Sequence, residues 1–162
     1  MNIGQKADER HEYAVSLVWT GASQGSTKTY QSYSREYDYR AGDKASMRGS
    51  ADPHFRGDPA LYNPEEMLVV ALSSCHMLSY LAECARGGVE VVAYEDSATG
   101  VMTVKEGTLR FTSVVLRPRV TIAATSDIGK AKALHHPAHE GCYIANSVNF
   151  PVTNEAIIQQ SS

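Results

Sequence analysis

The chain has 162 residues, of which 43% are apolar and 20% carry a charge, values that are ordinary for a globular protein. This length suffices for one domain to bury its own core, so we expect a single domain over residues 1–162. The net charge of −3 argues against a nucleic-acid surface, because such surfaces carry a basic excess. The longest apolar run, Met67–Leu72, is far shorter than the ~20 residues of a membrane span. Residues 1–12 do not resemble a secretion signal, so we expect a cytoplasmic protein without a membrane segment.

Two strands are predicted within residues 11–40, over His11–Trp19 and Thr29–Arg40, from their alternation of apolar and polar residues. Residues 41–62 contain glycines and prolines without a clear period, which predicts a long loop of the kind that often contributes to a functional site. A helix is predicted over residues 63–87. Asn63 suits its cap, Pro64 its first position, and Gly87-Gly88 its end. Because its residues are apolar or small on nearly every face, we expect this helix to be buried all round.

The second half of the chain is predicted to contain strands over residues 89–122, a helical segment over 126–142 and a short C-terminal strand over 146–153. Pro137 predicts a kink or break inside the helical segment. Strands that precede and follow one long helix, with few β-α-β crossovers, predict the α+β class.

The chain contains three cysteines, Cys75, Cys84 and Cys142, and no C-x-x-C pair, so a disulfide framework, a thioredoxin motif and a zinc ribbon are not expected. Cys75 lies in the predicted core helix. A buried cysteine is either an inert small apolar side chain or a reactive thiol, and composition alone favours the inert interpretation. Cys84 follows Cys75 by nine residues, on the opposite face of the helix, so we expect it to pack in the core.

A reactive Cys75 needs a nearby cation, because burial alone raises the pKa of a thiol. Arg56, Arg48 and Arg35 are the candidates, and Glu65 is a carboxylate that could pair with a buried arginine. Glu65 precedes Cys75 by ten residues, which is about 15 Å along one helix. If both serve one site, either the arginine bridges this gap or Glu65 comes from a second subunit. We therefore expect a two-fold dimer with sites at its interface.

The histidines over His135–His139, together with His76 and Cys142, lack the spacing of a known metal motif, and Pro137 disrupts an i, i+4 pair. We therefore expect no metal. Phosphate-binding glycine loops and a G-x-S-x-G elbow do not occur in the sequence, so we expect no nucleotide cofactor and no serine hydrolase.

Three motifs together resemble the OsmC/Ohr family of thiol-dependent reductases of organic hydroperoxides. They are Trp19-Thr20-Gly21, Asn63-Pro64-Glu65-Glu66 with Cys75 ten residues after Glu65, and Ala138-His139 followed by Cys142. The resemblance extends from the first strand to Val152. It implies an OsmC-like α+β fold, with antiparallel sheets packed around a long buried central helix, in an intertwined homodimer whose active sites lie at the interface.

The resemblance also implies the role of each site residue. Cys75 corresponds to the peroxidatic cysteine, Cys142 to the resolving cysteine and Glu65 to the site glutamate. Arg56 resembles the arginine of the OsmC branch, while the Arg-Asp-Gly turn of the Ohr branch is missing, which leaves Arg35 as the alternative.

The implied activity is reduction of organic hydroperoxides to alcohols through a Cys75 sulfenate and a Cys75–Cys142 disulfide. A lipoyl-type dithiol or a protein thiol would act as reductant, and no cofactor is implied. His76 departs from the phenylalanine that follows the cysteine in many members, which would change the polarity of the pocket. The alternative is a non-catalytic OsmC-like dimer that binds an apolar ligand or senses redox state.

Overall fold

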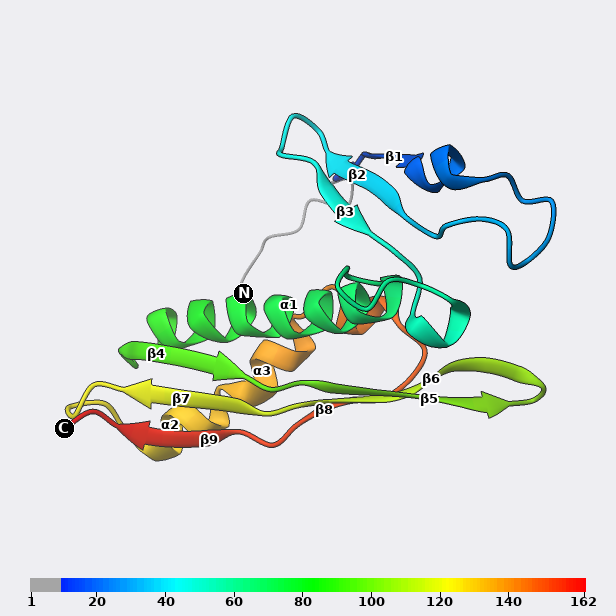
Figure 1. Ribbon diagram of the computed structural model, residues 1–162. Helices are drawn as coiled ribbons and strands as arrows, with labels where there is room; N and C mark the ends of the chain where they lie inside the picture. Colours follow the sequence, from blue (N-terminus) through cyan, green and yellow to red (C-terminus); the bar gives the residue numbers. More distant parts are fainter. Residues whose placement is uncertain (1–9) are drawn as a thin grey trace. The chain divides into compact units, whose positions relative to one another are not determined.

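The computed structural model describes residues 10–162, which form two compact units: an N-terminal unit up to Leu68 and a C-terminal unit over residues 69–162. The helix α1 (Pro64–Gly87) begins in the first unit and continues in the second. Figure 1 shows the elements of both units. The expectation of a single domain over residues 1–162 stays a prediction.

The N-terminal unit contains a three-stranded antiparallel sheet in the order β1-β2-β3. Every residue of β1, which is the strand at one edge, is exposed. The observed strand β1 is shorter than the predicted strand His11–Trp19, because it begins at Val15. The strands are β1 (Val15–Trp19), β2 (Tyr37–Ala41) and β3 (Met47–Gly49).

The second predicted strand was extended too far toward the N-terminus, because β2 begins at Tyr37 rather than Thr29. The preceding residues form turns around Arg35. The Arg35 guanidinium donates to the carbonyls of Tyr30 and Tyr33 and stacks on both rings, 4.5 and 3.9 Å from their centroids. These contacts stabilise a turn in place of the β-strand that the alternation of apolar and polar residues predicts here.

The predicted loop over residues 41–62 contains the strand β3 and a 3₁₀ helix (Pro53–Phe55), and the rest is irregular. Its turns are closed by backbone hydrogen bonds, such as the one that Gly57 N donates to the Asp52 carbonyl at 3.1 Å. A Cβ at Gly57 would lie 1.6 Å from the carbonyl oxygen of Ala51, so this position requires glycine.

The predicted helix is confirmed as α1, and its boundaries follow from local chemistry. The Asn63 side chain accepts a hydrogen bond from Glu66 N at 2.8 Å, and the Glu66 carboxylate accepts one from Asn63 N at 3.2 Å, which is a capping box. Gly88 adopts a φ of 70°, the left-handed conformation that ends a helix.

The expectation that α1 is buried all round is wrong for the chain as described. Its fully buried residues form one stripe at every fourth position, Leu72, His76, Tyr80 and Cys84. Leu78, between two members of this stripe, is 63% exposed. The 24 residues of α1 are together long and apolar enough to cross a membrane. The longest uninterrupted apolar run, Met67–Leu72, did not indicate this. The buried stripe of α1 packs in the protein core, however, so membrane insertion is not indicated.

The C-terminal unit contains two three-stranded sheets, in the orders β4-β7-β9 and β5-β6-β8. The β4–β7 and β5–β6 pairs are antiparallel, whereas β7–β9 and β6–β8 are parallel. The predicted antiparallel pairing is found in β4–β7 and β5–β6, and β8 and β9 add parallel strands because they return to the sheets after a helical connection. The strands are β4 (Val91–Asp96), β5 (Thr99–Lys105), β6 (Thr108–Leu116), β7 (Pro118–Ile122), β8 (Val152–Asn154) and β9 (Ile157–Gln160).

Two short helices, α2 (Ile128–Ala133) and α3 (His135–Glu140), replace the single helical segment predicted over residues 126–142. The break falls at Leu134, so Pro137 lies within the first turn of α3, where a missing N–H is tolerated. The strand predicted over residues 146–153 is mostly wrong, because Ala145–Ser147 forms a 3₁₀ helix and only the last two of these residues belong to β8.

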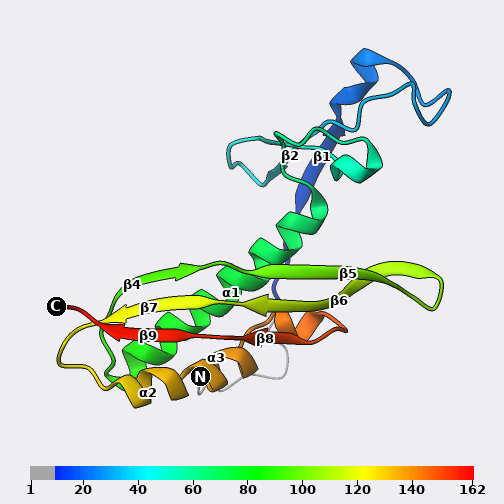
Figure 2. The ribbon, with the colours of Figure 1, turned by 60° about the horizontal axis from the view of Figure 1, so that its bottom comes forward.

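The core of the C-terminal unit lies between α1, the β4-β7-β9 sheet and the two short helices. Figures 1 and 2 show α1 running along this sheet, with α2 and α3 near its β9 side. The observed α+β architecture with a long central helix confirms the predicted class. The buried core residues that form one cluster are Tyr80, Cys84, Val89, Val120, Ile122, Ala131 and Ala138.

Candidate functional site

Two cysteines meet in the C-terminal unit. Cys75 is half-buried in the middle of α1, and Cys142, two residues after α3, is 1% exposed. Both are free thiols, and they lie close enough together that Cys75 contributes to the raised pKa of the Cys142 thiol. The Cys142 sulfur also accepts a hydrogen bond from Ala145 N at 3.4 Å. The fold thus brings together two cysteines that lie 67 positions apart in the sequence (142 − 75).

The environment of Cys142 disfavours its thiolate. Burial is the largest cause that raises the pKa of the Cys142 thiol, to about 11, and the nearby Cys75 side chain acts in the same direction. The Ala145 N–H opposes this rise, but more weakly. At neutral pH Cys142 is therefore a neutral thiol, whose S–H can act as a donor. Because the thiolate is the nucleophile, Cys142 is poorly suited to a first attack on a substrate.

Cys84 packs in the core, as predicted. It is 1% exposed and belongs to the buried cluster with Tyr80. Burial raises the pKa of its thiol. A neutral, enclosed thiol of this kind is inert.

A buried pair of histidines links the two elements that carry the cysteines. His76, the residue after Cys75, contacts His135 of α3, with 3.0 Å between His76 Nε2 and His135 Nδ1. The two rings are stacked, and His135 also stacks on Tyr80 at a centroid distance of 3.9 Å. Burial lowers the pKa of both histidines to about 4, so both rings are neutral at pH 7. The sequence suggested these histidines as a weak metal motif, and His76 as a change in pocket polarity, but it did not predict their pairing.

Metal binding has no geometric support in the part of the chain that the structure describes. Within residues 10–162 there is no group of three His, Cys, Asp or Glu side chains placed to hold an ion. The second nitrogens of the pair, His76 Nδ1 and His135 Nε2, are buried and have no hydrogen-bond partner.

Glu65 and Arg56, the other two predicted site residues, belong to the N-terminal unit. Glu65 is half-buried, and its Oε2 atom is enclosed without a hydrogen-bond partner. The charge of Glu65 contributes to a raised pKa of Tyr37, after burial and Tyr39. Arg56 is exposed, with a φ of 69°, and it pairs with no described residue. The structure therefore does not pair Glu65 with Arg56.

The two other arginine candidates already have partners. The turn that Arg35 holds together occupies its guanidinium, as described above. Arg48 forms an ion pair with Glu36. The assignment of the activating arginine stays a prediction.

Comparisons with known proteins were made over the whole chain. A family model described as OsmC-like protein matches residues 57–156, which include Glu65, Cys75 and Cys142. An OsmC-like protein of unknown function from Vibrio cholerae has a solved structure with 35% identity and a TM-score of 0.83. That match covers 91% of this chain and 100% of the Vibrio chain.

Two further relatives are more distant. The uncharacterized protein YmaD of Bacillus subtilis is 27% identical over 89 residues, which are 53% of this chain and 59% of YmaD. The chain thus spans little more than half the length of this curated relative. An organic hydroperoxide resistance protein OsmC from Legionella pneumophila shares the fold, with a TM-score of 0.67 and 12% identity over 93% of this chain and 98% of the other.

Proposed function

The chain belongs to the OsmC-like protein family, and from this premise we propose that it is a thiol-dependent peroxidase that reduces organic hydroperoxides to alcohols. The single observation that carries the proposal is the proximity of two free thiols, Cys75 and Cys142. The name of the Legionella protein, an organic hydroperoxide resistance protein, supports the same substrate class. We place the protein in the cytoplasm, where reducing thiols keep cysteines free.

Cys75 acts as the peroxidatic residue in this proposal. Its thiolate attacks the distal oxygen of the hydroperoxide, so that an S–O bond forms while the O–O bond breaks. The alkoxide takes up a proton and leaves as the alcohol, and Cys75 becomes a sulfenic acid. The raised pKa of Cys142 supports this order, because a neutral thiol is a weak nucleophile for the first attack.

Cys142 acts as the resolving residue. Its sulfur attacks the Cys75 sulfenic acid, a disulfide forms, and water leaves. An external dithiol, of the lipoyl type or on a protein, then reduces the disulfide by thiol–disulfide exchange and is itself oxidised. The existing contact between the two side chains means that this step requires little rearrangement.

Arg56 and Glu65 complete the site in a homodimer. The enclosed Glu65 oxygen without a partner fits a carboxylate that orients an arginine, and the exposed Arg56 guanidinium forms no ion pair with any described residue. The arginine polarises the O–O bond and stabilises the Cys75 thiolate. Because ten residues of α1 separate Glu65 from Cys75, a rise of about 15 Å, we propose that Glu65 serves the Cys75 of the partner subunit.

Exposed apolar surface supports the homodimer. The edge strand β1 exposes Val15, Leu17 and Val18 by 74, 61 and 64%, and on α1 Val70 and Leu78 are exposed by 60 and 63%. An exposed apolar edge strand is a surface that natural proteins cover. A second copy of this chain is the partner that a symmetric, self-complementary interface would bring to it.

The proposal is tested with a steady-state assay of cumene hydroperoxide against hydrogen peroxide, with dihydrolipoamide and thioredoxin compared as reductants. Cys75→Ser should lower turnover by about a thousandfold or more, because it removes the reacting atom. Cys142→Ser should still form one sulfenate per chain, trapped by dimedone, but should not turn over through the disulfide. Cys84→Ala is the matched control, since Cys84 lies in the core and should not affect turnover. Peroxidase activity that persists in Cys75→Ser would contradict the proposal.

A further inference from the structure

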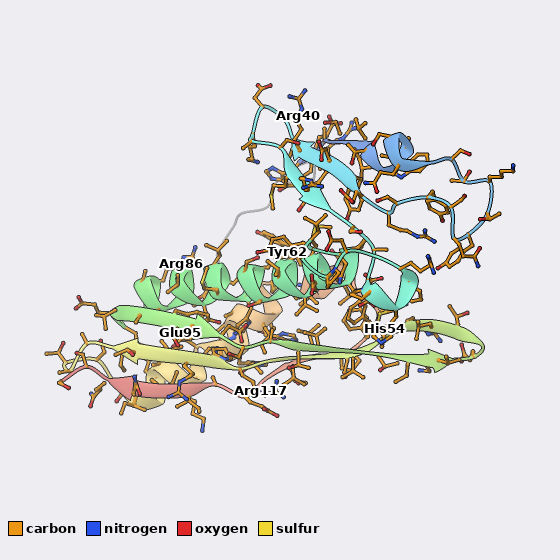
Figure 3. All side chains as sticks on the ribbon, viewed as in Figure 1. Arg40, His54, Tyr62, Arg86, Glu95 and Arg117 are labelled. Atoms are coloured by element: carbon orange, nitrogen blue, oxygen red, sulfur yellow. The ribbon has the colours of Figure 1, made fainter. Side chains whose placement is uncertain are left out.

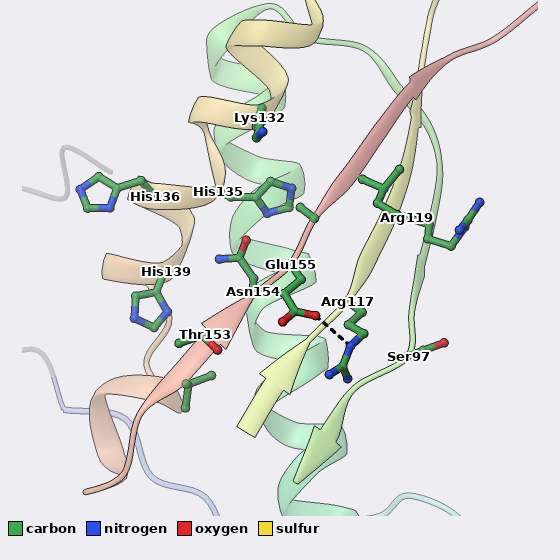
Figure 4. Close-up of a pocket in the computed structure, with 13 residues that line it drawn as sticks. Ser97, Arg117, Arg119, Lys132, His135, His136, His139, Thr153, Asn154 and Glu155 are labelled. Atoms are coloured by element: carbon green, nitrogen blue, oxygen red, sulfur yellow. Dashed lines mark hydrogen bonds and ion pairs between the residues drawn. The ribbon is translucent and has the colours of Figure 1, made fainter. Parts of the chain in front are cut away.

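The C-terminal unit contains a cavity of about 1060 Å³ that neither cysteine of the thiol pair lines. Figure 4 shows it between α2 and α3 on one side and β8, β9 and β7 on the other. This volume lies slightly above the usual range for small-molecule sites, about 300–1,000 Å³. The cavity is thus large enough for a small organic ligand.

Positive charge is concentrated at this cavity, although the chain as a whole has a net charge of −3. Arg117, Arg119 and Lys132 line it, against the single carboxylate of Glu155 among the described lining residues. Alternation along β7 explains the placement of Arg119, because Pro118 and Val120 are buried toward the core and Arg119 is exposed between them. Arg117 lies on the side of the sheet away from α1 (Figure 3).

Two of the three cations have no ionic partner. Arg117 donates to Glu155 at 3.0 Å and to Thr99 at 3.0 Å, so its charge is largely compensated. Arg119 and Lys132 form no ion pair with any described residue. Figure 4 shows Lys132 on the helices and Arg119 on the strands, with the Arg119 side chain extending away from the helices. A ligand that compensates both charges needs more than one anionic group.

A buried histidine provides a further polar group at the same cavity. His135 lines it, is only 4% exposed, and has no hydrogen-bond partner at Nε2. Its ring extends from α3 toward the strands (Figure 4). A buried polar atom left without a partner costs free energy, so a ligand that supplies the partner would gain affinity.

The tautomer of His135 decides whether that atom donates or accepts. Each neutral imidazole carries one N–H, and the contact between His76 and His135 uses one of them. If His76 Nε2 donates to His135 Nδ1, then His135 Nε2 carries the remaining proton and is a donor at the cavity. In the opposite arrangement His135 Nε2 is a bare acceptor. An anion in the cavity would favour the first arrangement, because it accepts the hydrogen bond.

We propose that this cavity is a binding site for a small organic polyanion that carries phosphate or carboxylate groups. Lys132 and Arg119 bind its charged ends, and His135 Nε2 donates a hydrogen bond to it. Occupancy fixes the direction of the hydrogen bond between His135 and His76, the residue next to Cys75. The site is separate from the thiol pair, so it does not depend on the proposed peroxidase activity.

The test is calorimetric titration of the full chain with pyrophosphate and with citrate at low salt, with inorganic phosphate as the smaller comparator. We expect saturable binding of one ligand per chain, tighter for pyrophosphate or citrate than for phosphate, and retained in Cys75→Ser. The tighter of the two polyanions identifies the preferred anionic group. Lys132→Gln should weaken binding by about tenfold or more, the usual effect of losing a hydrogen bond to a charged group.

Lys130→Gln is the matched control, on the same helix. Unlike Lys132, Lys130 does not line the cavity. Its side chain lies near the end of α1, where its Cε is 3.5 Å from the position that a Cβ on Gly87 would occupy. Its substitution should change the affinity by less than about twofold, as expected for an exposed charge outside the site. A shift of the His135 ring ¹⁵N resonances on addition of the polyanion is the second expected result. Failure of both polyanions to saturate, or equal weakening by Lys130→Gln and Lys132→Gln, would overturn the proposal.

Discussion

The two units of the chain differ in how much apolar surface they bury. All the fully buried apolar side chains of the described residues, from Leu72 to Val152, belong to the C-terminal unit. The described part of the N-terminal unit buries only two glycines, Ser50 and Asn63 to that extent, and β1 exposes all its apolar side chains. Burial of apolar surface is the main favourable term in folding. The C-terminal unit therefore has a core of its own, whereas the N-terminal unit leaves apolar side chains exposed that another protein surface would cover.

The candidate functional groups follow the same division. In the C-terminal unit the two thiols lie close to each other and the two histidines contact each other. All four residues except the half-buried Cys75 are buried. In the N-terminal unit, Glu65 has an enclosed oxygen without a partner, and Arg56 is exposed. This difference is consistent with the proposal that the thiol pair is assembled within one chain and that a partner subunit completes the site around Glu65 and Arg56.

Mixing of two inactive variants gives the strongest test of this comparison. Cys75→Ser is inactive in the proposed mechanism, and Glu65→Gln should lower kcat/KM by about a hundredfold, because the arginine loses its orientation. If Glu65 serves the partner's Cys75, a mixed dimer contains one intact site. A randomly mixed population of symmetric dimers should then recover about a quarter of the wild-type activity. The measurement is the peroxidase rate after the two variants are refolded together.

A second mixture provides the control, because Cys75 and Cys142 meet within one chain. Cys75→Ser mixed with Cys142→Ser should not recover disulfide turnover, since no chain then contains both cysteines. If the first mixture also stays inactive while dimers form, Glu65 serves the cysteine of its own chain. The division between the two halves of the site would then be wrong.

Leucine truncation in each unit sharpens the comparison of their cores. Leu116 of β6 is 1% exposed and Leu17 of β1 is 61% exposed. Leu116→Ala should lower the free energy of unfolding by about 2–5 kcal/mol, through lost burial and a cavity. Leu17→Ala should cost no more than about 0.5 kcal/mol through contacts within its own chain. Urea unfolding at several protein concentrations measures both.

Concentration dependence separates the two leucines further. Any larger cost of Leu17→Ala should grow with the fraction of dimer, because it would come from the interface. A loss at Leu17 as large as that at Leu116, and independent of protein concentration, would show that the N-terminal unit has a core of its own.

Local chemistry explains which parts of the fold could be predicted from the sequence. The helix α1 was predicted correctly because Asn63, Pro64 and Gly88 specify its ends within a few residues. The strand over residues 29–40 was predicted too long because the contacts of Arg35 with two tyrosine rings override the alternation. The parallel edge strands were missed, since strand direction depends on connections that span the helices.

The site shows the same limit. The spacing of the cysteines alone did not pair Cys75 with Cys142, and only the family resemblance suggested it. The contact between His76 and His135 joins residues 59 positions apart, and no local pattern marks it. The assignment of Arg56 depends on contacts with a second subunit, and a single sequence does not specify such contacts.

Acid stability gives the smallest expected effect and tests the completeness of the C-terminal unit. Burial is the main cause that lowers the pKa of His76 and His135 from 6.5 to about 4. The charge of His139 contributes to the shift of His76, which Asp96 opposes, and the charge of His76 contributes to that of His135. Above pH 6.5 these histidines are neutral in both folded and unfolded chains. Below it the unfolded chain binds protons that the folded chain resists, so stability falls as the pH drops from about 6.5 to about 4.

The expected loss for the pair is about 1–2 kcal/mol, less than the full 1.36 kcal/mol per pKa unit, because the two rings share one hydrogen bond and do not titrate independently. Urea unfolding between pH 4 and pH 7 measures it, and NMR titration of the ring resonances gives the folded-state pKa values directly. The double variant His76→Phe/His135→Phe should flatten the slope, whereas His136→Gln, at an exposed position, should leave it unchanged. Ring resonances that titrate near 6.5 in the folded protein would mean that water reaches the pair, and the C-terminal unit would then be less closed than its core implies.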